Sequence, residues 1–193
     1  MSELIEANLW HEICQGNRRS FEAFYNTYAR TLYDYGLKFT AKTTLIEDAI
    51  QELFIRIFEY NGSLNPKGNV LPYLFKSFRN NLFRMMARED KYSNKEPEEY
   101  SFDVTFSIEH KIMANEQELQ WKNQLVRGIS KLTSRQKEVI FLRYTEGLSY
   151  NEISKILDLE IESCRNANCK AISVLRSEFK AAVLVLFAFL KKK

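Results

Sequence analysis

The feature that most constrains the fold is a helical repeat of apolar residues. From Thr44 to Tyr60, apolar residues recur at intervals of three and four, which places them in one stripe of an amphipathic helix. The stripe consists of Ile46, Ala49, Ile50, Leu53, Phe54, Ile57 and Phe58. The chain holds only 6 Gly and 3 Pro among 193 residues, which disfavours a loop-rich all-β architecture. We therefore predict an all-α fold.

The helical pattern continues on both sides of this stretch. Residues 4–38 predict two more helices. Residues 61–69 carry Gly and Pro turn signals and predict a loop. A further helix is expected from about Pro72, because proline is tolerated in a first helical turn. Its predicted buried positions are Leu74, Phe75, Phe78, Leu82 and Met85.

The C-terminal half contains helix start and stop signals. Thr133 with Gln136, and Ser149 with Glu152, each fit a capping box, in which a hydroxyl residue is followed three positions later by Gln or Glu. Gly147 lies between the two boxes and is typical of a helix end. The pattern predicts one helix after each box.

A short turn separates the second of these helices from a longer one. Asp158–Glu160 predicts a turn of about three residues, and a helix is expected from about Ile161 to Phe179. Two helices joined in this way form a helix-turn-helix, whose second helix can enter the major groove of DNA. The sequence therefore predicts a DNA-binding element near the C-terminal end.

The middle of the chain lacks the helical pattern. Residues 89–120 carry a net charge of −6, and no amphipathic repeat is visible before about Phe106. We interpret this segment as a linker between two helical domains. The expected organisation is a first domain at 1–90, a flexible acidic linker at 91–112, a second domain at 113–180 and an apolar tail with lysines at 181–193.

The net charge of +3 averages over segments of opposite sign. Residues 66–88 carry +5 and no acidic residue, and residues 121–193 carry +7. Four aromatic residues lie among the basic residues of 66–88. Basic groups bind phosphates and aromatic faces stack on unpaired bases. The sequence thus predicts two nucleic-acid-binding regions rather than a uniformly basic protein.

Most enzyme classes are disfavoured. The chain has three cysteines without a CxxC pair, two histidines and no recognisable nucleotide, zinc or triad motif. Acidic residues at Glu96, Glu98 and Glu99 could bind Mg²⁺, but a solvated linker is the favoured interpretation. We expect a non-catalytic protein with no cofactor, no metal and no small-molecule substrate. No signal peptide is recognised, which predicts the cytoplasm.

Two segments resemble one known family. Asp48–Phe58 resembles the D-x-x-Q-E-x-F-x-x-x-[WF] helix of region two in sigma-70-type transcription initiation factors. Leu132–Leu157 resembles the start of region four in the same factors. The segments occur in the family's order, with an acidic linker where the extracytoplasmic-function (ECF) group lacks region three. The resemblance implies a two-domain ECF sigma factor.

The resemblance implies that the chain binds core RNA polymerase and promoter DNA, with an anti-sigma factor as a further partner. The implied polymerase-binding residues are Asp48, Gln51, Glu52, Ile55 and Glu59. Those implied for the −10 element, which region two melts, are Asn61, Ser63, Asn65, Tyr73, Lys76, Arg79, Asn80, Phe83 and Arg84. Those implied for the −35 element, which region four reads as duplex, are Glu162, Ser163, Arg165, Asn166 and Lys170.

Region four departs from the family pattern at three places. Asp158 replaces the usual glycine of the turn, Glu160 and Glu162 add negative charge, and Asn168 stands where the family has an aliphatic core residue. Carboxylates suit a helix N-terminus but repel phosphate. We therefore expect weak −35 binding by this helix in the absence of polymerase.

Two questions stay open at this stage. The segment from Leu132 also fits the DNA-binding domain of LuxR-type regulators, although that interpretation leaves the Asp48–Phe58 helix unexplained. The apolar tail at 181–190 is too short to span a bilayer. It could pack on region four, dock on polymerase or an anti-sigma factor, or contact a membrane surface.

Overall fold

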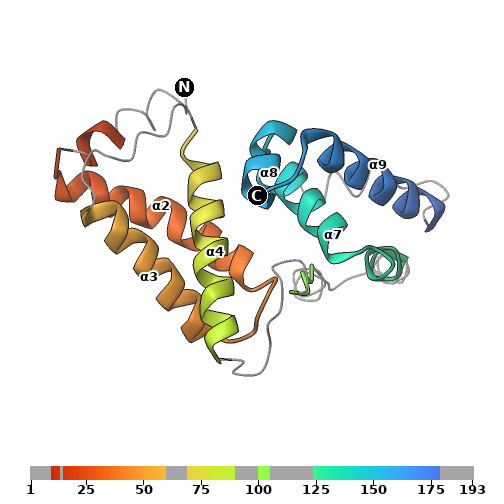
Figure 1. The fold of residues 1–193 in the computed structure, drawn as a ribbon, viewed down its shortest axis with the longest axis horizontal. Helices are drawn as coiled ribbons and strands as arrows, with labels where there is room; N and C mark the ends of the chain where they lie inside the picture. The colour runs from red at the N-terminus through yellow and green to blue at the C-terminus, as the bar shows by residue number, and fades with distance from the viewer. Residues whose placement is uncertain (1–9, 14, 60–68, 90–99, 105–123, 179–193) are drawn as a thin grey trace, which may run out of the picture. The chain divides into compact units, whose positions relative to one another are not determined.

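The computed structural model describes residues 10–13, 15–59, 69–89, 100–104 and 124–178. The chain divides into two compact units, Met1–Pro97 and Glu98–Lys193. The described parts of both units are helical and contain no strand (Figure 1). The predicted all-α fold with two helical domains is confirmed.

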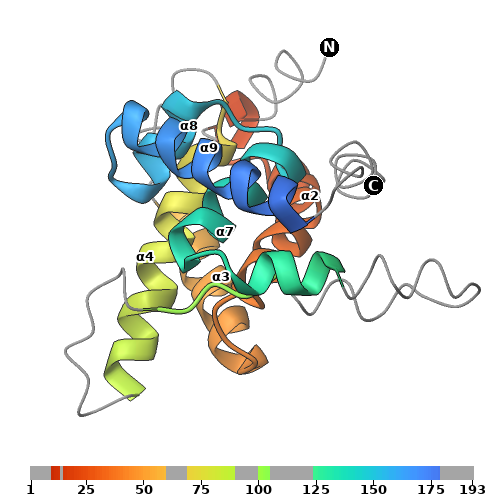
Figure 2. The ribbon, with the colours of Figure 1, turned by 90° about the vertical axis from the view of Figure 1, so that its right-hand side faces the viewer.

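The first unit is built on three long helices, α2 (Arg18–Gly36), α3 (Thr43–Glu59) and α4 (Leu71–Glu89). Helix α3 packs against both α2 and α4, and α3 and α4 lie side by side in both ribbon views (Figure 2). The side chains of Leu32, Tyr35, Phe75 and Phe78 are fully buried. The Tyr35 ring meets the Phe75 ring edge to face at a centroid distance of 4.8 Å.

Helices α3 and α4 start within one residue of the expected positions, and α2 ends at Gly36, two residues before the expected end at Lys38. Helix α4 begins just before Pro72, where the Oδ1 atom of Asn69 accepts a hydrogen bond of 3.0 Å from the backbone N–H of Leu71. Two predicted core positions differ from the structure. Phe58 is 39% exposed and Met85 is only half-buried. Both lie in the C-terminal part of their helices, and the Phe58 ring still contacts the Phe21 ring of α2, at a centroid distance of 5.1 Å.

The second unit holds α7 (Ser134–Ile140), a π-helical turn η2 (Phe141–Thr145), α8 (Tyr150–Leu157) and α9 (Ile161–Glu178). Residues 124–130 are also helical. Both predicted capping boxes are present, with reciprocal side-chain bonds at Thr133 and Ser149. Gly147 has a φ of +73°, as expected for a residue that ends a helical segment. The π-helical turn was not predicted.

The helix-turn-helix is confirmed. Helix α8 ends at Leu157 and α9 starts at Ile161. Asp158 adopts the left-handed conformation, with φ 52° and ψ 46°, and its backbone N–H donates to the carbonyl oxygen of Ser154. Asp158 therefore occupies the conformation for which glycine is preferred at a helix end.

Part of the predicted linker is packed onto the second unit. Phe102 is fully buried, and its ring centroid lies 5.6 Å from that of Phe141. Val104 packs against a core cluster that includes Ile129 and Leu175. Residues 100–104 are not helical, so a search for helical periodicity could not reveal their burial.

Several predictions fall outside the described residues. These are the loop residues Asn61, Ser63 and Asn65, the acidic residues Glu96, Glu98 and Glu99, and the tail at 181–193.

Within the described part of the chain, no helix is both long and apolar enough to cross a membrane.

Candidate protein and nucleic-acid interfaces

Helix α3 presents an acidic face with an apolar residue in it. Asp48, Gln51 and Glu59 are exposed, Glu52 is half-buried, and Ile55 is 55% exposed. A surface that combines carboxylates with an exposed aliphatic side chain suits a basic, partly apolar partner, because both charge and apolar area then find a complement. All five predicted residues of this interface lie on α3.

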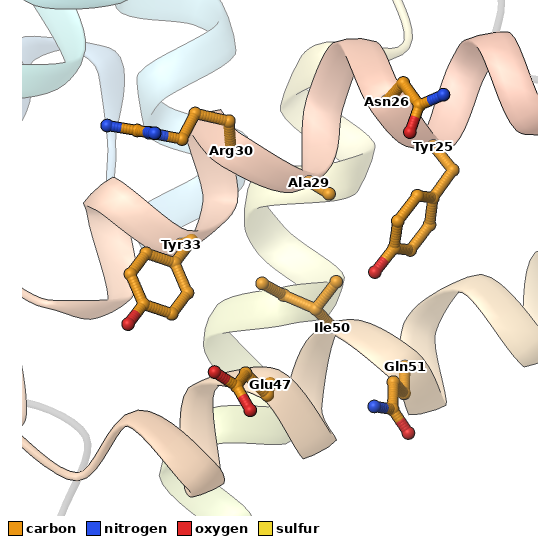
Figure 3. Close-up of a pocket in the computed structure, with 8 residues that line it drawn as sticks. All are labelled: Tyr25, Asn26, Ala29, Arg30, Tyr33, Glu47, Ile50 and Gln51. Carbon is orange, nitrogen blue, oxygen red and sulfur yellow. The ribbon is translucent and has the colours of Figure 1, made fainter.

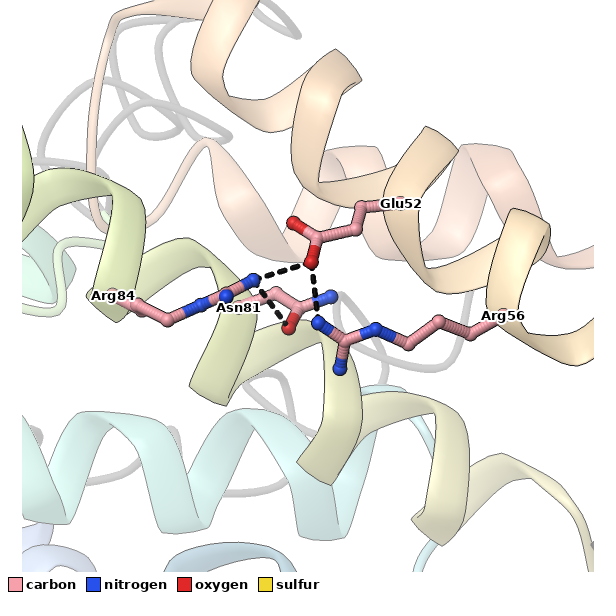
Figure 4. A network of polar contacts seen from close by, with 4 residues as sticks. All are labelled: Glu52, Arg56, Asn81 and Arg84. Atoms are coloured by element: carbon pink, nitrogen blue, oxygen red, sulfur yellow. Dashed lines mark hydrogen bonds and ion pairs between the residues drawn. The ribbon is translucent and has the colours of Figure 1, made fainter.

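Glu52 differs from the other residues of this face because it binds α4. Its carboxylate accepts hydrogen bonds from Arg56 on its own helix and, at 2.5 Å, from Nη2 of Arg84 on α4 (Figure 4). Arg84 holds the pKa of Glu52 below its ordinary value, burial opposes this effect, and Arg56 assists it. The Arg84 side chain also donates to Oδ1 of Asn81 at 3.3 Å. Arg84 is therefore held from both helices.

The predicted DNA-binding residues of α4 fall into two groups. Tyr73, Lys76 and Arg84 are half-buried and Asn80 is exposed. Their spacings of three, four and four place them on one side of the helix. Together they offer an aromatic ring, two basic groups and an amide.

Arg79 and Phe83 form the second group, and both are buried. The Arg79 guanidinium lies 4.4 Å from the centroid of the Phe83 ring. Phe83 is 5% exposed and packs edge to face on Phe39 at 4.9 Å. A ring buried in this way does not offer its face to an unpaired base, so the implied −10 contact of Phe83 does not fit the observed packing. The segment after α2, which holds Phe39, covers this side of α4, and the repeat within α4 alone does not reveal that contact.

A pocket of about 470 Å³ lies between α2 and α3 (Figure 3). Tyr25 and Tyr33 extend into it from α2, and Ile50 lies across from them on α3. Gln51 borders the pocket and also belongs to the acidic face. No motif pointed to this pocket, because its residues come from two helices and only their packing brings them together.

The predicted base-reading residues of α9 are all exposed: Glu162, Ser163, Arg165, Asn166 and Lys170. Ser163, Asn166 and Lys170 share one side of the helix by their spacing. Arg165 forms an ion pair with Glu162 at 3.4 Å. Glu162, which departs from the family pattern, thus lies beside the basic side chain of Arg165.

Asn168 lies on the opposite, buried side of α9 and is 6% exposed. Its Nδ2 atom donates to the hydroxyl of Tyr150 at 2.9 Å and to that of Tyr144 at 3.3 Å. Within the described residues, its Oδ1 atom has no hydrogen-bond partner. Burial raises the pKa of Tyr150. Asn168 therefore replaces an aliphatic contact with a partly satisfied polar network.

Across the described ranges, no group of three or more His, Cys, Asp or Glu side chains is arranged to hold a metal ion.

Two family descriptions match the chain in separate segments. Sigma-70 region 2 matches residues 24–92, and Sigma-70, region 4 matches residues 122–172. The first match contains α3 and α4, and the second contains α8, the turn and α9 as far as residue 172. The chain belongs to the sigma-70 family and, within it, to the ECF group. It is an alternative sigma factor that acts in transcription initiation. Sigma factors are transcription regulators rather than enzymes.

Curated sigma factors match over most of the chain. It is similar to the ECF RNA polymerase sigma factor SigX of Bacillus subtilis, with 20% identity over 83% of this chain and 84% of the relative. The sigma factor SigM of the same organism is 23% identical over 85% of this chain and 98% of the relative.

A solved structure has a similar fold. RpoE of Bartonella quintana, in complex with the anti-sigma factor NepR, gives a TM-score of 0.57 at 19% identity and covers 85% of this chain and 99% of its own. Nothing in the structure or the comparisons favours a LuxR-type regulator, because the region 2 match accounts for the segment that such a regulator leaves unexplained.

Proposed function

We propose that the sigma factor uses three separate helix faces, one for each step of initiation. The observation that carries the proposal is the occurrence, in one chain, of an acidic face on α3, a basic and aromatic face on α4, and an exposed polar face on α9. Each face has the chemistry that its partner requires.

The α3 face binds core RNA polymerase. Asp48, Gln51, Glu52 and Glu59 supply hydrogen-bond acceptors and negative charge, and Ile55 supplies apolar area. A basic helical surface with an apolar centre is the matching partner. The neighbouring pocket between α2 and α3 offers a place for a side chain of that partner.

The α4 face binds the single strand of the −10 element. Lys76 and Arg84 bind phosphates, Tyr73 stacks on an unpaired base, and Asn80 reads a base edge. Phe83 is omitted from this set, because its ring is used in the core. Arg79 acts by holding that ring in place. Asn61, Ser63 and Asn65 are proposed to contact the flipped −10 base, on the sequence resemblance alone.

The α9 face contacts the −35 duplex. Ser163, Asn166 and Lys170 face the major groove, while the Glu162 carboxylate offsets the charge of Arg165. Because phosphate contacts dominate affinity for DNA, this helix alone binds weakly, and its attachment to polymerase supplies the missing affinity through effective concentration.

The factor has no catalytic activity of its own and works in the cytoplasm, where core polymerase and promoters are found. An anti-sigma factor is proposed as a regulator, supported by the fold shared with a sigma factor that was solved in complex with one.

The assignment of the α3 face is tested by co-elution with core polymerase. Asp48→Arg is expected to weaken binding at least tenfold, because it places a cation opposite a basic surface. The matched control is Glu22→Arg, an equal charge reversal at an exposed position of α2. If Asp48→Arg co-elutes as fully as Glu22→Arg, the α3 face is not the polymerase-binding surface.

A further inference from the structure

The carboxylate of Glu52 on α3 forms an ion pair with a residue of α4. Glu52 belongs to the proposed polymerase-binding face, and Arg84 belongs to the proposed DNA-binding face of α4 (Figure 4). The two residues are 32 positions apart in sequence and form a direct ion pair. In the free protein, a residue of the proposed polymerase-binding face is therefore already paired with a residue of the proposed DNA-binding face.

The ion pair leaves both side chains within reach of external partners. The Glu52 side chain is 31% exposed and the Arg84 side chain is 39% exposed. A basic group of polymerase can approach Glu52, and a phosphate of DNA can approach Arg84. The basic group of polymerase competes with Arg84 for the single carboxylate of Glu52. The phosphate of DNA competes with Glu52 for the guanidinium of Arg84.

The surroundings allow Arg84 to remain in place when Glu52 is withdrawn. Asn81, which is 4% exposed, accepts a hydrogen bond from Arg84 on the same helix. Arg56 supplies a second cation to Glu52, so that carboxylate is not left without a partner when Arg84 turns to DNA. Each side chain of the pair therefore keeps one partner inside the protein during the exchange.

We propose that Glu52 masks Arg84 in the free sigma factor and releases it for DNA when a basic group of polymerase takes up the Glu52 carboxylate. The inference rests on the proposed roles of the α3 and α4 faces and adds a coupling between them. The coupling is reciprocal, so DNA bound at Arg84 strengthens polymerase binding at Glu52 by the same factor. Partly exposed ion pairs are weak, which limits that factor to about three- to fivefold.

The coupling is tested by DNA binding to the free, full-length protein. The probe is a fluorescein-labelled single strand of mixed sequence at low salt, and binding is followed by anisotropy. Glu52→Gln is expected to bind this strand about three- to fivefold more tightly than the wild type. In an Arg84→Gln background, the same change is expected to have no more effect than the loss of one negative charge elsewhere.

Two further variants control for charge and folding. Glu47→Gln is the matched control, because it makes the same change at an exposed position of the same helix. Glu52→Asp keeps the charge but shortens the side chain, so a gain in affinity in this variant cannot come from net charge. Circular dichroism checks that each variant remains helical.

The inference is overturned if Glu52→Gln binds no more tightly than Glu47→Gln, including the case in which neither binds measurably, or if its gain persists without Arg84. Run-off transcription with core polymerase is measured alongside. If the wild type supports transcription but the Glu52 and Arg84 variants show no coupling in DNA binding, this inference alone is contradicted. Failure of the wild type to support any transcription removes the proposed function instead.

Discussion

Asp158 is a single residue on which the geometry of the helix-turn-helix depends. Its φ of 52° lies in the left-handed region, which costs most L-residues about 1–2 kcal/mol and costs aspartate less. Asp158→Gly is expected to leave the free energy of unfolding within about 0.5 kcal/mol of the wild type. Glycine relieves the backbone strain of the folded state, but it also raises the conformational entropy of the unfolded chain, and the two effects nearly cancel. Asp158→Ala is expected to destabilise the second unit by about 1 kcal/mol. Urea unfolding followed by circular dichroism compares the two variants, and equal losses would contradict the turn geometry.

Asn168 gives a second prediction at this scale. Its buried Oδ1 atom lacks a hydrogen-bond partner among the described residues, and an unsatisfied buried acceptor costs about 1–3 kcal/mol. Asn168→Leu is expected to raise the stability of the second unit by about 1 kcal/mol, since Tyr144 and Tyr150, whose hydroxyls accept hydrogen bonds from Asn168, are only half-buried residues.

Asn168→Asp is the isosteric comparison, and it is expected to destabilise the unit because it buries a charge. Thermal unfolding measures both changes. A Leu variant that is less stable than the wild type would show that the tyrosine hydrogen bonds outweigh the unsatisfied oxygen.

At the scale of elements, Gly36 sets how closely α2 approaches its neighbours. A Cβ atom at this position would lie 2.8 Å from Cγ2 of Ile46 on α3 and 3.0 Å from Cζ of Phe78 on α4. Gly36→Ala is therefore expected to destabilise the first unit by about 1–3 kcal/mol, although alanine favours helices. Chemical denaturation tests this, and a more stable alanine variant would contradict the observed packing of the three helices.

The ion pair between α3 and α4 predicts a dependence of stability on pH. Because the folded-state pKa of Glu52 is lowered, its stabilisation is present above the unfolded-state pKa and is lost as pH falls through the folded-state value. The stability difference between wild type and Glu52→Gln is expected to stay constant well above the ordinary glutamate pKa of about 4.3 and to shrink as pH falls below it. A difference that stays constant as pH falls below that value would show that the carboxylate does not stabilise the unit through its charge.

At the scale of the whole molecule, periodicity was a good guide to helices and a poor guide to the contacts between them. The limits of α3, the two capping boxes and the turn at Asp158–Glu160 follow from local sequence, and the structure confirms them. The burial of Phe83 depends on Phe39, and that of Phe102 depends on Phe141. Each partner lies far away in sequence, so no local pattern could reveal these contacts.

The functional residues divide in the same way. Helical spacing correctly predicted that Asp48, Ile55 and the proposed base-reading residues of α9 are exposed. It could not show that Glu52 and Arg84, predicted for two different interfaces, bind each other, because that requires α3 and α4 to be placed side by side. The two helical units explain how a nearly neutral chain carries oppositely charged surfaces for different partners.

The central claim is that this chain directs core RNA polymerase to promoters. The most direct measurement is run-off transcription on a genomic promoter library with core polymerase from the same organism, with and without the protein. The account predicts a set of start sites that appears only with the wild-type protein, persists with Glu22→Arg and is lost with Asp48→Arg. Identical transcripts with and without the wild-type protein would contradict it.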